Sequence, residues 1–254
     1  MILLSDRALL KISGIDVREF LQGLITNDIN KLTAQNALYA ALLSAQGKYL
    51  FDFILYEING DIVLDVDAGR AEELIKKLKV YKLRSKVEIT PMSDFKVFYD
   101  LEEGIPDPRS TRLGKRYLSD EAQVENGSME DYETLRLQVG APGARDLVAE
   151  DSYILQNNFE ALNGVDFGKG CYVGQEIVAR MKYKGGVRRS LYRIEGDKDL
   201  PAAGEKITAA DKTIGEMRSS LGAIGLAQCE ISEVAPGKKY FCGDVKIKLL
   251  PLAL

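Results

Sequence analysis

Cys171 is the side chain of this sequence with the clearest capacity for chemistry. It lies in the segment KGCYVGQE, residues 169–176, between a Lys-Gly step and a tyrosine. The cationic Lys169 and the start of a helix near Gly174 both favour thiolate over thiol, and Glu176 suits the first turn of that helix because of the helix dipole. The segment therefore predicts a reactive thiol. A glycine-rich turn that carries a buried cysteine is the alternative.

The absence of histidine restricts the remaining chemistry. The 254 residues include no histidine, which excludes nucleophilic arrangements with an imidazole base and zinc sites with an imidazole ligand. Proton transfer would fall to Asp, Glu, Lys, Tyr or Cys. The three cysteines are widely spaced and odd in number, which argues against a disulfide framework, so we expect a cytoplasmic protein. Cys229 and Cys242 lie in predicted strands, where we expect core thiols.

Charge and hydropathy limit the partners that this chain would bind. The net charge is −4, so direct nucleic-acid binding is not expected. No apolar run approaches the roughly 18 residues of a membrane span. No basic region lies in residues 1–6, so we predict no secretory signal and no membrane association.

Two stretches are locally basic against this average. Six cations and no acid lie between Glu73 and Glu88, and six more lie between Glu176 and Glu195. We interpret the first stretch as a solvated face. The second directly follows residues 169–176, and four of its members are expected to line an anion-binding cleft. They are Arg180, Lys184, Arg188 and Arg189.

Hydrophobic periodicity predicts the elements that would position these side chains. Apolar residues at helical spacing predict helices at 17–24, 71–78 and 129–139, and Asp16 is the expected cap of the first. Apolar runs predict strands at 8–12, 37–43, 50–58, 62–66, 86–90 and 95–101. A hairpin is expected at Asn59-Gly60. Residues 144–169 have no clear period and predict a long extended connection, and six short strands between 188 and 250 predict a small β-barrel.

Five motifs together resemble the YgfZ family of folate-binding-fold proteins. The chain carries KGCYVGQE at 169–176, and four further motifs precede it in the order of that family. They are FLQG at 20–23, TND at 26–28, YKLRSKV at 81–87 and ALNG at 161–164. The resemblance extends from about residue 6 to about residue 195. It implies a role in iron–sulfur cluster assembly and repair, which mitochondrial counterparts perform for [4Fe-4S] enzymes.

The resemblance also implies the fold class, which is α+β. The expected architecture is the folate-binding fold of the glycine cleavage T-protein, an aminomethyltransferase, with two α+β domains and a small C-terminal β-barrel around a central channel. Residues 1–48 and 130–185 would form a discontinuous first domain. Residues 49–129 would form a ferredoxin-like second domain, and residues 186–254 the barrel.

Tetrahydrofolate or a derivative is the cofactor that the resemblance implies. Asp52 matches the aspartate at the reacting nitrogen in the aminomethyltransferases, but Phe51 replaces the acid before it. Gln138 stands where both groups commonly carry a glutamate that clamps the pterin. A neutral amide offers one acceptor oxygen where a carboxylate offers two. The other expected cofactor-binding residues are Asn27, Asp28, Arg84, Tyr132, Lys169, Gln175, Glu176, Arg180 and Arg188.

The function implied is that of a folate-binding accessory protein in iron–sulfur cluster assembly. Clusters generally take about four thiolates, so Cys171 would be a functional thiol or one ligand of a cluster shared with a partner. The expected partner is an A-type iron–sulfur carrier or an iron–sulfur client enzyme, including tRNA-modifying ones. A tetrahydrofolate-dependent aminomethyltransferase that uses Asp52 is the alternative. An interaction module without ligand is the third reading.

Overall fold

The computed structural model describes residues 1–253, and a five-stranded sheet forms its centre. The order of strands is β3-β4-β5-β2-β6, all antiparallel. The strands are β2 (Arg7–Ser13), β3 (Ala37–Leu43), β4 (Tyr49–Ile58), β5 (Asp61–Asp67) and β6 (Glu88–Pro91). Helices α1 (Val17–Gln22) and α2 (Ala71–Lys82), with the 3-10 turns η1 (Ile29–Lys31) and η2 (Ala68–Arg70), complete this part.

Both faces of this sheet are buried, which explains why β3 is a continuous apolar run. Its side chains alternate between two cores. Tyr39, Ala41 and Leu43 pack on one side, whereas Leu38 and Leu42 pack on the other side with α1 and α2. The sheet therefore separates the two main hydrophobic cores of the molecule. A polar side chain on either face is buried and needs a hydrogen-bond or ion-pair partner.

The local signals at the ends of these elements are mostly confirmed. Asn59 and Gly60 have φ of 53° and 86°, as a tight hairpin between β4 and β5 requires. Asp16 is the N-cap residue of α1, as expected, but its side chain makes no capping hydrogen bond. Its carboxylate instead accepts a hydrogen bond from the backbone N–H of Lys86 at 2.6 Å.

A second, four-stranded sheet packs beside the first and precedes helix α3. Its order is β1-β7-β9-β8. The elements are β1 (Ile2–Leu3), β7 (Lys96–Asp100), β8 (Ile105–Pro106), η3 (Thr111–Leu113) and β9 (Lys115–Ser119). Helix α3 (Met129–Val139) has the predicted bounds, because Ser128 and Asp131 form a capping box and Gly140 ends it at φ 90°.

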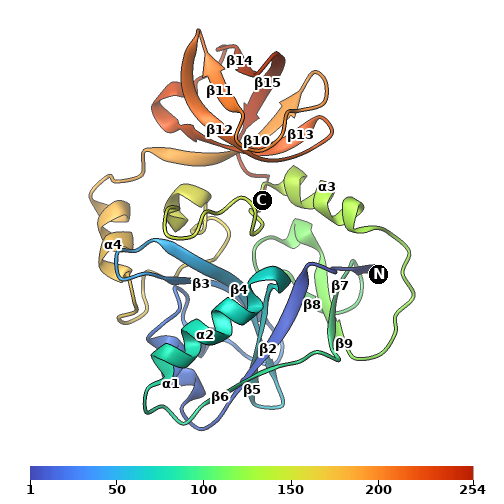
Figure 1. Ribbon diagram of the computed structural model, residues 1–254, viewed down its shortest axis with the longest axis vertical. Coiled ribbons are helices and arrows are strands. Elements are labelled where there is room, and N and C mark those ends of the chain that lie inside the picture. The colour runs from blue at the N-terminus through green and yellow to red at the C-terminus, as the bar shows by residue number, and fades with distance from the viewer. Residues whose placement is uncertain (254) are drawn as a thin grey trace.

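The segment from residue 144 to residue 174 has no strand, as predicted, but the extended surface connection expected over residues 144–169 is wrong, because Phe159 and Leu162 are buried in one of the two main cores. It contains one short helix, η4 (Ile154–Asn157), and leads into α4 (Gln175–Tyr183). Backbone bonds fix it to the sheet: the N–H of Tyr49 donates to Ser152, and that of Asp166 donates to Thr26. The segment and α4 lie between the central sheet and the barrel (Figure 1).

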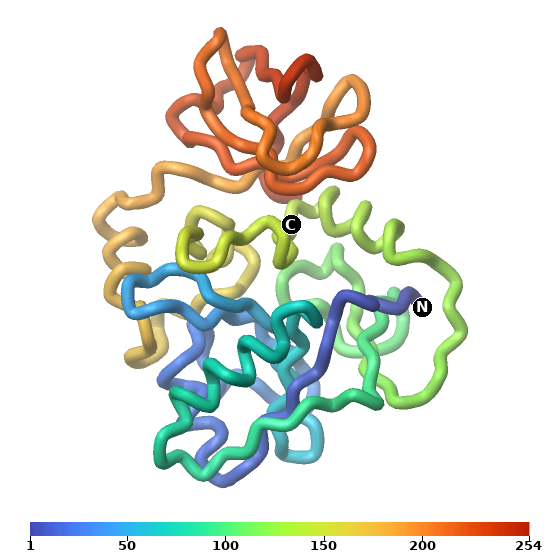
Figure 2. Tube along the Cα trace, viewed as in Figure 1, coloured from blue at the N-terminus to red at the C-terminus, as the bar shows by residue number. Residues whose placement is uncertain are grey.

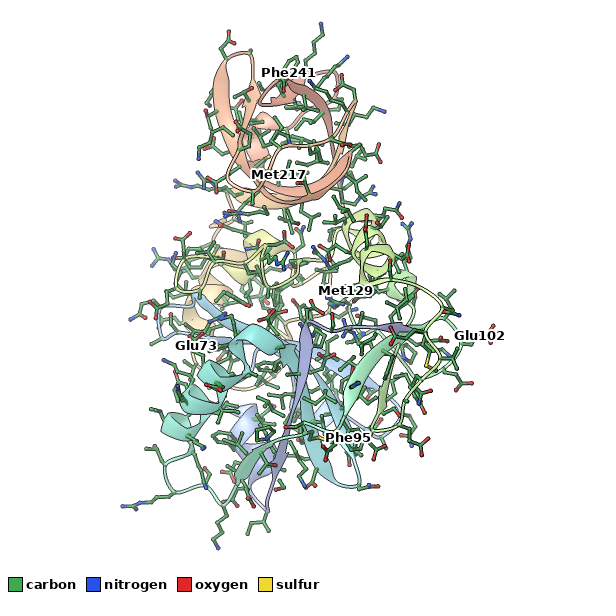
Figure 3. All side chains as sticks on the ribbon, turned by 45° about the vertical axis from the view of Figure 1, so that its right-hand side comes forward. Glu73, Phe95, Glu102, Met129, Met217 and Phe241 are labelled. Atoms are coloured by element: carbon green, nitrogen blue, oxygen red, sulfur yellow. The ribbon has the colours of Figure 1, made fainter. Side chains whose placement is uncertain are left out.

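The C-terminal strands form a closed six-stranded barrel, as predicted. Its order is β10-β13-β12-β11-β14-β15. The elements are β10 (Arg189–Gly196), β11 (Lys206–Ala209), β12 (Lys212–Leu221), β13 (Ile224–Glu230), η5 (Ile231–Glu233), β14 (Tyr240–Cys242) and β15 (Val245–Leu250). Side chains fill its interior, and Met217 lies at the end that faces the rest of the molecule (Figure 3). Cys229 and Cys242 are core thiols, as expected.

The structure confirms an α+β protein with a terminal β-barrel (Figure 2). The expected limit at residues 48 and 49 lies in the turn of a hairpin, because β3 and β4 pair in one sheet. The division of residues 1–185 into two domains stays a prediction. No helix among the described residues is long and apolar enough to cross a membrane.

Candidate functional site

Cys171 is exposed at the tip of the loop that leads into α4. The residues on both sides of it are anchored: Lys169 is 6% exposed and Tyr172 is 7% exposed. The backbone N–H of Val173 also donates to the carbonyl of Gly23, at the end of α1. The alternative of a buried cysteine is therefore wrong, and the loop presents the thiol to solvent between two fixed points.

The ammonium group of Lys169 fixes this loop to the end of α1. Its Nζ donates to the backbone carbonyls of Gln22, Ile25 and Asn27 at 2.9, 2.6 and 2.8 Å. Burial lowers the pKa of Lys169 to about 8, so the group is still mostly protonated at pH 7 and uses all three of its donors. Lys169 is thus occupied in holding the loop and has no donor left for a cofactor.

Gly174 holds the other end of the loop against the turn between β3 and β4. It has φ of +84°, and a Cβ there would lie 2.6 Å from the carbonyl oxygen of Ser44 and 3.0 Å from Cα of Gly47. Gly170, in contrast, has open space around it. Of the two glycines that flank Cys171, only Gly174 is required by the packing.

The side chains of the TND segment at 26–28 make hydrogen bonds within the chain and do not line the groove or the cysteine loop. The Thr26 hydroxyl donates to the carbonyl of Gly164, and the Asn27 amide donates to the carbonyls of Asn163 and Tyr39. The Asp28 carboxylate accepts from the N–H of Asn30 and caps η1. The motifs TND and ALNG therefore bind each other, and the buried Asn27 is not available to a ligand.

A groove of about 480 Å³ lies along α4 and brings three of the predicted cations together. Arg180, Lys184 and Arg188 line it, with Tyr153 and Met181 among the apolar residues. Within residues 1–253, these three cations make no ion pair and no side-chain hydrogen bond, and no acid lines the groove. The fourth expected cation is elsewhere: Arg189 lies 3.9 Å from Glu230 on the barrel.

Gln175 and Glu176 form the first turn of α4. Glu176 is exposed, as expected for a negative charge at a helix N-terminus. Neither residue lines the groove. Their position does not place them against a ligand.

Asp52 lies on β4 and faces two buried tyrosines. The hydroxyls of Tyr39 and Tyr49 donate to its two carboxylate oxygens at 3.0 and 2.7 Å. Burial, with the nearby Asp52 charge, raises the pKa of both tyrosines well above the usual range, so both remain donors. The pocket that Asp52 lines together with Tyr49 and Phe51 has about 10 Å³, roughly the space of one water molecule.

A buried ionic network fills the interior between the two sheets. Asp65 binds Arg7 and Arg116 at 2.6 Å each, and Asp107 binds Arg116 at 2.9 Å and Arg109 at 2.8 Å. Burial opposes ionisation of Asp107, but the two guanidinium groups hold its pKa well below the usual range. The network joins the sheets by charge as well as by packing.

Tyr132 belongs to this network. Its hydroxyl accepts hydrogen bonds from Arg109 and Arg116 at 3.0 and 2.8 Å. The predicted cofactor contact of Tyr132 is therefore taken by two arginines. Sequence reasoning did not find the network, although Asp65 in the middle of an apolar strand and the Asp-Pro-Arg step at 107–109 were signals of it.

Two further residues that were predicted to bind the cofactor lie away from both Asp52 and the groove along α4. Arg84 is exposed in the loop after α2 and has no ion pair within residues 1–253. Gln138 is exposed at the end of α3, where its backbone carbonyl accepts from Arg193 on the barrel. The structure does not bring either one to Asp52 or to the groove. No cluster of three or more potential metal ligands occurs in the described part of the chain, with or without Cys171.

Comparison with known proteins relates most of the chain to one group of proteins. It is 33% identical over 269 residues to the iron–sulfur cluster assembly factor IBA57, mitochondrial, of Homo sapiens, covering 88% of this chain and 75% of that protein. The protein of the same name from Mus musculus is 32% identical over 270 residues, with the same coverage. A homologue from Neurospora crassa is 31% identical over 244 residues, covering 79% of this chain and 56% of that protein.

The barrel and the overall fold have their own matches. Residues 188–252 match the family of the CAF17 C-terminal β-barrel domain. The crystal structure of the glycine cleavage system aminomethyltransferase T from Bartonella henselae has a TM-score of 0.78 at 14% identity, covering 99% of this chain and 84% of that one. The predicted aminomethyltransferase-like fold is confirmed.

One expectation is contradicted by these comparisons. We expected a cytoplasmic protein, because free cysteines indicate a reducing compartment. The relatives are named as mitochondrial proteins. The cysteine pattern reports on redox conditions, and it does not distinguish between compartments that keep thiols reduced.

Proposed function

Because this chain belongs to the family of the IBA57 iron–sulfur cluster assembly factors, we propose that it acts in iron–sulfur cluster assembly or repair through the thiol of Cys171. The observation that carries this proposal is the presentation of Cys171. It is the one exposed cysteine of the three, and it lies between two buried anchors. Packing and hydrogen bonds that restrict a loop in this way favour a defined geometry for its exposed group.

The chemistry follows from the number of ligands. A thiolate binds iron after its proton is released to solvent, and a cluster generally needs about four such ligands. This chain offers one, so the others come from a partner. An A-type iron–sulfur carrier that brings the cluster supplies them in our proposal, and Cys171 is either a shared ligand or the thiol that receives or stabilises the cluster. Support for iron–sulfur enzymes, including tRNA-modifying ones, would follow from that activity.

We further propose that a folate occupies the groove along α4. Small-molecule sites usually measure about 300–1,000 Å³, and the groove has about 480 Å³, whereas the space at Asp52 has about 10 Å³. Arg180 and Arg188 carry planar groups suited to the carboxylates of a glutamate tail. The ring of Tyr153 and the thioether of Met181 offer apolar contacts to the aromatic part.

The geometry gives less support to an aminomethyltransferase that uses Asp52. A catalytic carboxylate must lie within hydrogen-bond reach of the reacting group. Both oxygens of Asp52 accept hydrogen bonds from tyrosines, and the pocket that Asp52 lines with Tyr49 and Phe51 has only about 10 Å³. The likeness to the aminomethyltransferase is one of fold at 14% identity.

Complementation tests the proposed function. The chain is expressed in cells that lack their own member of this family, and the activity of a [4Fe-4S] enzyme is measured. Cys171→Ser should abolish the recovered activity. Cys229→Ser and Cys242→Ser are matched controls, because these buried thiols act only through stability. Equal losses from all three variants at matched protein levels would refute the role of Cys171.

Folate binding needs its own measurement. Titration with tetrahydrofolate triglutamate should show binding that weakens with salt, because exposed charge pairs are screened over about 8–10 Å at physiological ionic strength. Arg188→Ala should weaken this binding, and Arg189→Ala is the control because Arg189 lies outside the groove. Binding that is indifferent to salt and to Arg188→Ala would remove the groove from the proposal.

A further inference from the structure

Exposed aliphatic side chains gather at the end of the molecule that is farthest from the barrel. Ile15, Val80 and Leu83 are 81%, 69% and 88% exposed. They come from the loop before α1 and from the end of α2, which lie together in Figure 1. The two loops are joined, because the N–H of Lys86 donates to the Asp16 carboxylate at 2.6 Å. We call these three side chains the α1–α2 patch.

The backbone holds Leu83 out of the core. It ends α2 with φ of 44° and ψ of −105°, a conformation that is unfavourable for a residue with a Cβ. A leucine that is both strained and exposed contributes little to the stability of the isolated chain. Strained residues of this kind cluster at functional places such as active sites, ligand clamps and switch regions.

Unpaired cations surround the patch. Lys79, Lys82, Arg84 and Lys86 make no ion pair within residues 1–253. The acids beside the patch are Asp16, whose carboxylate accepts the N–H of Lys86 and keeps its charge, and Glu19 and Glu88 at the margins. The four cations outnumber these three acids by one, so the surroundings of the patch are slightly positive, whereas the whole chain has a net charge of −4. This complementarity favours an acidic partner.

The patch lies close to the loop of Cys171. Helix α1 has six residues, a length of about 9 Å at 1.5 Å per residue. The patch adjoins its first residue, and the carbonyl of Gly23 at its other end accepts from Val173 of the cysteine loop. One partner surface of about 800 Å² is wide enough to cover both.

We infer that the α1–α2 patch is the docking surface for the protein that meets Cys171, and that this protein presents an acidic surface with an apolar pocket for Leu83. This inference rests on the proposed function. Leu83 is the anchor, Val80 and Ile15 widen the apolar contact, and Lys82 and Arg84 provide attraction at the rim. A membrane surface is the competing occupant of such a patch, and the test separates the two.

Binding of an A-type iron–sulfur carrier, measured by calorimetry with the full chain, tests the inference. Leu83→Ser should weaken binding about tenfold, as expected for an anchor residue, and Arg84→Glu should weaken it most at low salt. Val124→Ser is the matched control, because Val124 is 87% exposed in another loop. It should change binding less than about twofold.

Leu83→Gly separates docking from folding. Glycine removes the side chain and tolerates positive φ, so this variant should unfold no earlier than the wild type and still bind the carrier about tenfold more weakly. Wild-type affinity in Leu83→Gly and Leu83→Ser would overturn the inference while complementation by Cys171 still stood. Binding to vesicles of anionic phospholipid that Leu83→Ser abolishes would also overturn it. Absence of carrier binding by the wild type would also overturn the docking inference. The proposed function fails by a different result, which is full complementation by Cys171→Ser.

Discussion

At the scale of residues, the three cysteines differ in what they can do. Cys171 is exposed, and Cys229 and Cys242 are buried in the barrel. Burial raises the pKa of Cys229 to about 12 and that of Cys242 to about 11. The nucleophile is the thiolate, so neither buried thiol reacts appreciably at pH 8.

Alkylation with iodoacetamide at pH 8 should therefore add a single label to the native protein. Mass spectrometry of the digested protein should place it on Cys171, and three labels should appear in denaturant. Labelling of Cys229 or Cys242 in the native protein at the rate of Cys171 would contradict the structure.

Lys169 anchors the loop that carries the thiol. Lys169→Met removes three hydrogen bonds to backbone carbonyls. The variant should lose about 1–3 kcal/mol of the free energy of unfolding, because the carbonyls remain without this partner. Urea unfolding measures the loss. Lys182→Met is the control, since Lys182 is paired with Glu160 at the surface and should cost under about 1 kcal/mol; equal effects of both variants would refute the anchoring role.

At the scale of elements, the turn between β3 and β4 determines where α4 begins. Gly174 and Gly47 lie in close contact, and Gly47 also meets Ile177 of α4. Gly174→Ala should destabilise the protein by about 1–3 kcal/mol, from positive φ and from the clash with Ser44. It should also change the alkylation rate of Cys171. Gly170→Ala, at a position with open space, should alter stability by less than about 0.5 kcal/mol. Similar losses from Gly174→Ala and Gly170→Ala would show that close packing at Gly174 does not fix the loop.

The elements were the part of the structure that the sequence predicted best. The six barrel strands, the Asn59-Gly60 hairpin and α3 all depend on local periodicity or turn chemistry, which a single sequence carries. Strand β9 was missed because proline and glycine interrupt the residues before it. Asp16 is the N-cap residue that was expected, but the partner of its carboxylate, the N–H of Lys86, lies 70 residues away and could not be predicted from local sequence.

The candidate site was predicted only where its residues are near one another in the sequence. The motif around Cys171 and the cations of the groove are near in sequence, so their proximity could be inferred. The direction of a side chain could not be inferred from a motif: Asn27 and Tyr132 point into networks of their own chain, and Gln138 is exposed. Resemblance gave the correct fold, but it did not show which cavity is open.

At the scale of the whole molecule, the buried network joins the two sheets. Asp107→Asn leaves Arg109 and Arg116 short of a counter-charge and should cost about 3–5 kcal/mol at pH 7. Because the folded pKa of Asp107 lies below its ordinary value of 3.8, its contribution is present above about pH 4 and is lost as the pH falls further. The variant should therefore lose less stability than the wild type between pH 4 and pH 2.

Equilibrium unfolding across that pH range measures this difference. Asp120→Asn is the control, because Asp120 is exposed and should change stability by less than about 0.5 kcal/mol. A small effect of Asp107→Asn at pH 7, or an unchanged acid response, would contradict a network that holds the sheets together by charge.

The most direct test of the account is the spectrum of a cluster shared through Cys171. The protein, an A-type iron–sulfur carrier, iron and sulfide are mixed without oxygen, and the absorption and circular dichroism of the complex are recorded. We expect the wild type to give a cluster spectrum distinct from that of the carrier alone. Cys171→Ser should remove the difference, and Cys229→Ser and Cys242→Ser should retain it. An identical spectrum from wild type and Cys171→Ser, with both bound to the carrier, would contradict this expectation.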